Sequence, residues 1–160
     1  MSLATDSIFT TALQSNSDLM ATLGYVAPTL TDKGKPARLY GTAIPLPDED
    51  ANNAPVPYVI VTFDGLNNDT GSKDDCYESE YDKVDIGIEV VCKTLKGLHD
   101  LTQMVRDTIL AYFRATETAV EDYTFTADAI QYDSLKPCYW QTLRYQCNVH
   151  NLEDDEQDED

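Results

Sequence analysis

Residues 81–94 read YDKVDIGIEVVCKT, and the alternation of apolar and polar side chains in this stretch decides the fold. An extended strand would turn one set of side chains toward a core: Val84, Ile86, Ile88, Val90 and Cys92. It would turn the other set toward water: Lys83, Asp85, Gly87, Glu89 and Lys93, with Val91 as the exception. A period of two is typical of an antiparallel strand with one covered face and one wet face.

This strand leads directly into a helix. Apolar residues recur along one stripe over roughly four helical turns: Leu98, Leu101, Val105, Ile109 and Tyr112. Thr94 precedes the first turn and is the expected N-cap, because a threonine oxygen can accept a hydrogen bond from a free amide there. The sequence therefore predicts a strand followed by an amphipathic helix that packs on the sheet.

Other strands are predicted on both sides of this pair. Tyr58–Phe63 is apolar on both faces, as expected for a strand that is covered on both sides. Tyr123–Tyr132 and Tyr139–Val149 are strand-like, and Arg38–Tyr40 is a possible short strand. The stretch 65–75 is too long for a tight hairpin and too polar to be buried, so we expect it to project as an arm.

The N-terminal region predicts a helix in which Asp6 or Ser7 caps the first turn. Its apolar residues lie at helical spacing: Ile8, Phe9, Ala12 and Leu13. Polar residues 15–17 interrupt the helix, residues 18–23 resume it for a turn or two, and Gly24 ends it. Residues 25–57, which are rich in proline, predict an irregular segment.

The order of elements is helix, irregular segment, strand, strand, helix, strand, strand. Such an order predicts an α+β fold, with an antiparallel sheet of about four strands and two helices packed on one face. Residues 1–150 would form a single domain. Residues 151–160 would form an acidic C-terminal tail, because seven of the last eight residues are acidic.

The chain is strongly acidic, with 29 acidic and 11 basic residues and a formal net charge of −18. A negative surface disfavours general binding to nucleic-acid backbones and to anionic membranes. Residues 1–13 do not have the pattern of a signal peptide, and no apolar run approaches the ~18 residues of a membrane helix. We therefore expect no membrane association, and reduced cysteines in a protein that is assembled in the cytoplasm.

The sequence contains few groups that could react. Its two histidines, His99 and His150, are far apart, and its four cysteines form no CxxC pair. Cys92 is expected in the core, Cys138 and Cys147 point to opposite faces of one strand, and the acidic neighbours of Cys76 disfavour a thiolate. No phosphate-binding or nucleophile motif occurs, and the acidic loop 64–71 lacks the residue order of a calcium-binding EF-hand. We expect no catalytic site, no cofactor and no metal.

Aromatic residues suggest contact surfaces, because tyrosine and tryptophan combine apolar area with a polar tip and are enriched in interfaces. The candidates for an oligomer interface lie on the expected arm and at strand ends: Leu66, Asn67, Asn68, Asp69, Tyr77, Tyr81, Tyr139 and Trp140. Ordinary half-buried strand tyrosines are the alternative interpretation.

The order of these features resembles the phage tail terminator or tail-completion family, which includes the minor tail protein U of lambda-like phages. After an N-terminal helix, the resemblance rests on four successive pieces: residues 38–45, Pro57–Val61, Asp82–Phe113 and Gln131–His150. It covers roughly residues 5–150. The acidic tail and residues 48–53 depart from the family pattern.

The resemblance implies a structural virion protein without catalytic residues. Its subunits would form a ring, usually hexameric, that caps the head-proximal end of the tail tube and joins it to the head connector. Its partners would be the tail-tube protein and connector or neck proteins, and DNA would pass through the lumen without specific binding. The alternatives are a neck or head–tail joining protein, an acidic binding module such as a DNA mimic, and an enzyme of unrecognised type.

Overall fold

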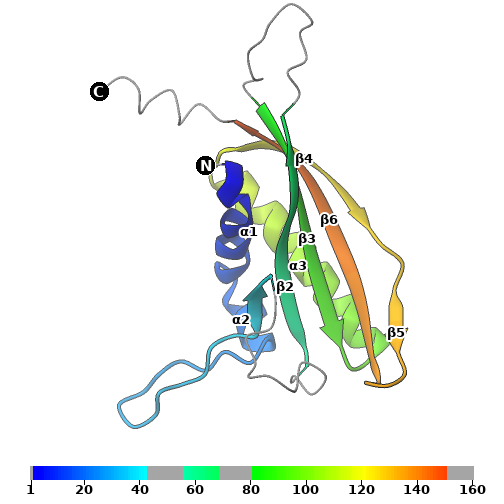
Figure 1. Cartoon of the computed structure of the whole chain (residues 1–160). Coiled ribbons are helices and arrows are strands. Elements are labelled where there is room, and N and C mark those ends of the chain that lie inside the picture. The colour runs from blue at the N-terminus through cyan, green and yellow to red at the C-terminus, as the bar shows by residue number, and fades with distance from the viewer. Residues whose placement is uncertain (1, 43–55, 69–80, 151–160) are drawn as a thin grey trace, which may run out of the picture.

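The computed structural model describes residues 2–42, 56–68 and 81–150, which form a sheet with helices on one side (Figure 1). The helices are a 3-10 turn at Ser2–Ala4, α1 at Thr5–Gln14, α2 at Ser17–Thr22 and α3 at Leu95–Ala115. The strands are β1 at Leu39–Gly41, β2 at Tyr58–Asn67, β3 at Tyr81–Cys92, β4 at Val120–Ala127, β5 at Gln131–Asp133 and β6 at Cys138–His150. None of the described helices is both long and apolar enough to cross a membrane.

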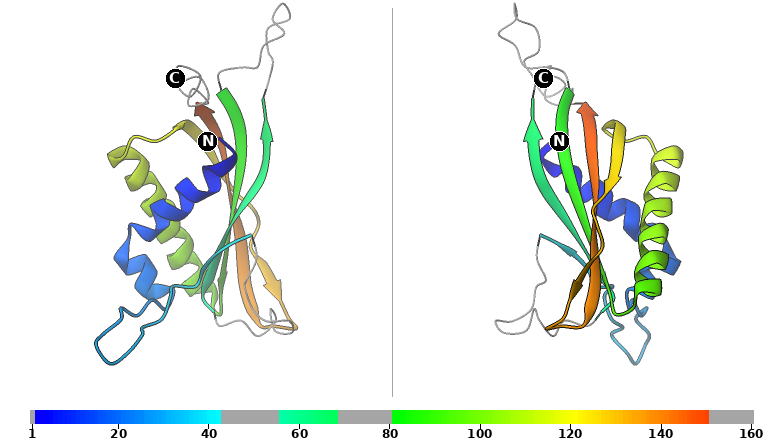
Figure 2. Two further views of the ribbon diagram at one scale, coloured as in Figure 1. Left: turned by 60° about the vertical axis from the view of Figure 1, so that its left-hand side comes forward. Right: turned by 90° about the vertical axis from the view of Figure 1, so that its right-hand side faces the viewer.

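The strand order is β1-β2-β3-β6-β4, and the short β5 also pairs with β6. The β1–β2 pair is parallel and all other pairs are antiparallel. At the centre, β3 pairs with β6 over its full length, from Tyr81 opposite His150 to Cys92 opposite Tyr139. A strand of this length spans roughly 37 Å. The sheet therefore has two well-separated ends, and the described helices all lie on one of its faces, which leaves the other helix-free in this part of the chain (Figure 2).

The core lies between the sheet and the helices. The predicted alternation of β3 is confirmed: its inward-facing residues from Val84 to Cys92 are at most 4% exposed. The α3 stripe is buried from Leu98 to Ile109, whereas Tyr112 is half-buried. The predicted N-cap is also confirmed, because the amide of Gly97 donates to Thr94 Oγ1 at 3.0 Å.

The prediction of about four strands was too low, since the described residues contain six. Two of the six have only three residues, β1 and β5, and such short strands show no periodicity. The predicted single strand Tyr123–Tyr132 is divided into β4 and β5, which pair with successive parts of β6. At the other edge, β2 continues to Asn67, so residues 65–67 belong to a strand rather than to a projecting arm.

The N-terminal prediction was wrong in its helix cap and helix count. A 3-10 turn runs into α1 at Thr5, so Ala4 occupies the cap position without a side-chain hydrogen bond, and neither Asp6 nor Ser7 is the cap. The interruption at residues 15–17 makes α2 a separate helix and gives three α-helices in the described residues. Asn16 caps it, because its Oδ1 accepts from the amides of Asp18 and Leu19 at 3.0 and 3.2 Å.

Candidate oligomer interface

The residues predicted to form an interface lie at opposite ends of the sheet. Leu66 and Asn67 end β2 and Tyr81 begins β3, whereas Tyr139 and Trp140 lie near the start of β6. The β3–β6 register places these two groups nearly a full strand length apart. They cannot form one continuous patch. Asp69, Tyr77, the rest of the predicted arm and the predicted tail at 151–160 lie outside the described residues.

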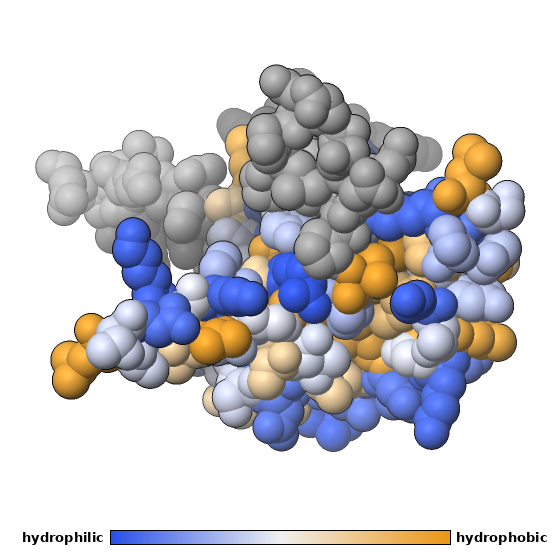
Figure 3. Space-filling view, turned by 90° about the horizontal axis from the view of Figure 1, so that it is seen from below, coloured by the Kyte–Doolittle hydropathy of each residue, from blue (hydrophilic) through white to orange (hydrophobic). Residues whose placement is uncertain are grey.

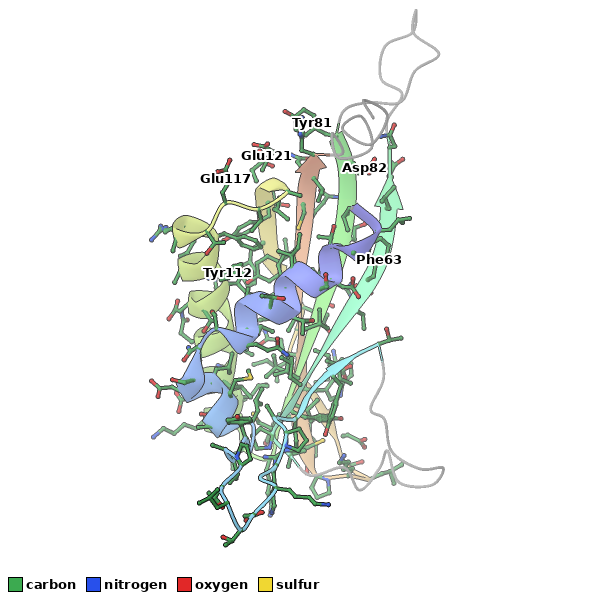
Figure 4. The ribbon with its side chains drawn as sticks, turned by 90° about the vertical axis from the view of Figure 1, so that its left-hand side faces the viewer. Phe63, Tyr81, Asp82, Tyr112, Glu117 and Glu121 are labelled. Atoms are coloured by element: carbon green, nitrogen blue, oxygen red, sulfur yellow. The ribbon has the colours of Figure 1, made fainter. Side chains whose placement is uncertain are left out.

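The end that carries Tyr81 is polar and acidic. Asn68 Nδ2 donates to Asp82 Oδ1 at 2.7 Å, and the ring of Tyr81 lies 4.8 Å from that of His150. Glu117 and Glu121 lie at the same end (Figure 4). Tyr81 is 42% exposed and Leu66 is 37% exposed, so both leave apolar area available to a partner.

The aromatic pair at the other end is largely used within the chain. Trp140 packs on the helix-free face with Tyr58, Val91 and Cys138. Burial, together with the nearby Glu89, raises the pKa of Tyr58 to about 12. Tyr139 faces the main core, and its ring centroid lies 4.9 Å from that of Tyr132, with the two rings tilted by 50°. Trp140 and Tyr139 are thus half-buried strand residues that retain partial exposure.

A network of charged side chains occupies the middle of the helix-free face. Arg144 Nε donates to both carboxylate oxygens of Asp128 at 3.0 Å, and its Nη1 lies 3.7 Å from Asp64 Oδ2. The hydrogen bond to Arg144 holds the pKa of Asp128 below its usual value. Asp64 and Arg144 line a shallow, solvent-open hollow of about 430 Å³. Gly87 lies beneath Asp64, and a Cβ there would overlap the Asp64 carboxylate.

Groups that could react do not converge in the described residues. No three His, Cys, Asp or Glu side chains in these ranges could share a metal ion. Burial raises the pKa of the Cys92 thiol to about 11 and that of Cys147 to about 12. Cys138 and Cys147 lie on opposite faces of the sheet, as predicted. The Tyr145 hydroxyl has no hydrogen-bond partner in the described residues, and its ring lies within an aromatic cluster.

The three described cysteines are free and buried, so we expect them to be unreactive in the folded protein. In a Cys76→Ser variant, a colorimetric thiol reagent should detect essentially no thiol in buffer and three thiols in denaturant. Rapid labelling of the native variant would contradict this arrangement of the strands.

The sequence did not predict a hairpin arm at residues 25–37, between α2 and β1. It extends away from the body at the lower left of Figure 1. Val26 and Lys35 form a bridge with two backbone hydrogen bonds of 2.9 Å. The turn is closed by Asp32, whose Oδ1 accepts from the amide of Gly34 at 3.1 Å, where Gly34 has a φ of 74°. Asp32-Lys33-Gly34 is the sequence signal that could have identified this turn.

The geometry of the described residues defines a class: a two-layer α+β domain with its helices on one face of the sheet and a projecting hairpin. No family model matches the chain, and no curated protein matches it. Its fold is similar to that of a chain from a solved structure described as the virion of a native gene transfer agent particle. The TM-score is 0.54 with 13% identity, and the match covers 89% of this chain and 92% of that chain. At this identity the likeness shows a common fold.

Proposed function

We propose that this chain is a structural subunit of a phage-like virion rather than an enzyme. The observation that carries the proposal is the likeness to a chain of a gene transfer agent virion, a phage-like particle. The match covers nearly the whole of both chains. The likeness therefore extends over the complete domain and is not limited to one common supersecondary unit. The scattered titratable groups of the described residues agree with an architectural role.

Within such a particle, the proposed role is that of a tail terminator. The subunits would form a ring at the head-proximal end of the tail tube, with six copies as is usual for tail terminators. Its partners would be the tail-tube protein on one side and head–tail connector or neck proteins on the other. The protein would be assembled in the host cytoplasm and remain in the tail or neck region of the virion.

The charge of the chain fits a ring through which DNA passes. The helix-free face carries Asp64, Asp85, Glu89 and Asp128 against Lys83 and Arg144, and Arg144 is paired with two of these carboxylates. A surface of this sign repels phosphates, so DNA would pass through the lumen without specific binding. Asp64 and Asp85 are exposed and Glu89 is half-buried, so all three carboxylates would contribute to this repulsion.

The mass of the purified protein in solution tests this function. Sedimentation should give a species near six times the chain mass of 17.9 kDa, either alone or after tail-tube subunits are added. The matched control is the same protein mixed with connector subunits. An oligomer that binds the connector but not the tube would favour the head–tail joining role, which the same fold likeness also supports. A stable monomer that inhibits a DNA-binding enzyme would contradict a virion role and favour the DNA mimic.

A further inference from the structure

The arm at residues 25–37 is held firmly at its base. Arg38 closes it, because its amide donates to the Leu23 carbonyl at 2.8 Å and its Nε donates to the Pro57 carbonyl at 2.9 Å. Its carbonyl also accepts from the amide of Val59 at 3.0 Å. These bonds join the end of α2, the arm and β2. Together with the bridge between Val26 and Lys35, they give the arm a defined direction.

The tip of the arm presents an apolar side chain to solvent. Leu30 is 106% exposed, and Tyr25 and Val26 are each 47% exposed. Figure 3 shows hydrophobic residues at the outer end of this arm, well away from the body. Hydrogen bonds thus position an apolar tip in water, where it contributes nothing to the stability of the single chain.

The arm also differs from the rest of the molecule in charge. Two lysines and one aspartate give it a net charge of +1, whereas the whole chain carries −18. Its basic residues, Lys33 and Lys35, follow closely after Leu30. A surface that complements the arm would therefore combine an apolar centre with carboxylates. An acidic second copy of the same chain offers such surfaces.

One groove on the helical layer has this combination. It has a volume of about 450 Å³ and is lined by Asn16, Asp100, Gln103, Met104, Asp107, Thr108 and Ala111. Met104 and Ala111 provide apolar area, and methionine adapts readily to an incoming side chain. Asp100 and Asp107 are exposed on α3 and lie roughly 10 Å apart along the helix axis. Two lysines that are two residues apart, with long side chains, can reach both carboxylates.

We propose that the arm of one subunit docks in this groove of the next subunit. Leu30 packs on Met104 and Ala111, and Lys33 and Lys35 pair with Asp100 and Asp107. The arm and the groove are different surfaces, so the contact is head-to-tail and closes into a ring when the rotation between subunits allows it. This inference rests on the proposed function as a ring subunit and identifies the contact between neighbours.

Disulfide crosslinking tests the contact directly. In a Cys76→Ser background, the pair Leu30→Cys and Ala111→Cys should give a ladder of crosslinked chains under mild oxidation, with the ring size as its largest band. Either substitution alone should give none. The control pair is Leu135→Cys with Ala111→Cys. Leu135 is about as exposed as Leu30, at 96%, but it lies in another turn of the chain, between β5 and β6. It should also give no ladder.

Charge reversal tests the same contact without introducing a disulfide bond. Lys33→Glu with Lys35→Glu should raise the midpoint concentration of assembly about tenfold or more at low salt, because two attractions become repulsions. Adding Asp100→Lys and Asp107→Lys should restore assembly. Leu30→Ser should weaken assembly about 10- to 100-fold, as expected when a buried leucine is lost from an interface.

The outcomes separate the two proposals. A ring that forms normally when the arm is changed and gives no ladder would overturn the arm contact and leave the tail role intact. Failure of the Asp100 and Asp107 reversals to restore assembly would overturn the groove as the docking site. A chain that stays monomeric at every concentration, also with tail-tube subunits present, would contradict both the contact and the ring.

Discussion

Phe9→Ala is expected to lower the free energy of unfolding by about 3–5 kcal/mol, the usual range for removing a buried phenylalanine. Phe9 lies on α1 and is fully buried. Its ring centroid lies 5.3 Å from that of Phe113 on α3 and 5.2 Å from that of Tyr145 on β6. One side chain therefore joins both long helices to the central sheet, and its loss opens a cavity where three elements meet.

Urea unfolding followed by circular dichroism measures this effect. It should be carried out at one fixed protein concentration, because assembly stabilises the folded state by mass action. Leu3→Ala is the matched control: Leu3 is in the same N-terminal segment but 77% exposed, so the change should stay within about 0.5 kcal/mol. A loss below ~1 kcal/mol for Phe9→Ala would contradict the packing of α1 against α3 and β6.

The long strand β3 and the long helix α3 were predictable because each has one face toward the core and one toward solvent. The alternation of β3 and the stripe of α3 record which side chains face the core. The exception in β3, Val91, also has a structural explanation. It lies on the helix-free face, where Tyr58, Cys138 and Trp140 cover it. The prediction that Tyr58–Phe63 is covered on both sides is confirmed for its first four residues, all at most 8% exposed.

What the sequence did not predict depends on contacts between distant residues. β1 is a strand only because it pairs in parallel with β2, about twenty residues further along the chain. Asn16 caps α2 and also donates to Thr108 Oγ1 on α3 at 2.8 Å, a contact that no local pattern encodes. The interface candidates were chosen by residue type, but residue type carries no information on where the residues lie in the fold. It therefore could not show that Tyr81 and Trp140 lie at opposite ends of the sheet.

The arm was missed for a related reason. Prolines and polar residues between 25 and 57 suggested an irregular segment. The hairpin is defined by one isolated bridge and by the fixing of its base by Arg38. The direction of the arm depends on the positions of α2 and β2, which hold its two ends together. The exposure of Leu30 can be recognised only in three dimensions, because a lone leucine in a polar stretch has no periodicity.

Gly24→Ala is expected to lower the free energy of unfolding by about 2–3 kcal/mol. Gly24 lies between α2 and the arm and has a φ of 89°, a conformation that costs a residue with a Cβ roughly 1–2 kcal/mol. The added Cβ would also overlap the guanidinium group of Arg38. The guanidinium group has to shift, and we expect this shift to weaken the 2.9 Å hydrogen bond from Arg38 Nε to the Pro57 carbonyl. The arm would then lose part of its fixed direction.

Two further variants separate the backbone cost from the side-chain overlap. Gly41→Ala is the matched control. Gly41 in β1 has no positive φ, and an added Cβ would meet no atom of the described residues within 4 Å, so its effect should stay within about 0.5 kcal/mol. Arg38→Ala removes the overlapping group, so the double variant with Gly24→Ala should lose less stability than the sum of the single losses. Strict additivity in urea unfolding would mean that Arg38 does not lie over Gly24. The arm would then lack the contact that fixes its base on this side.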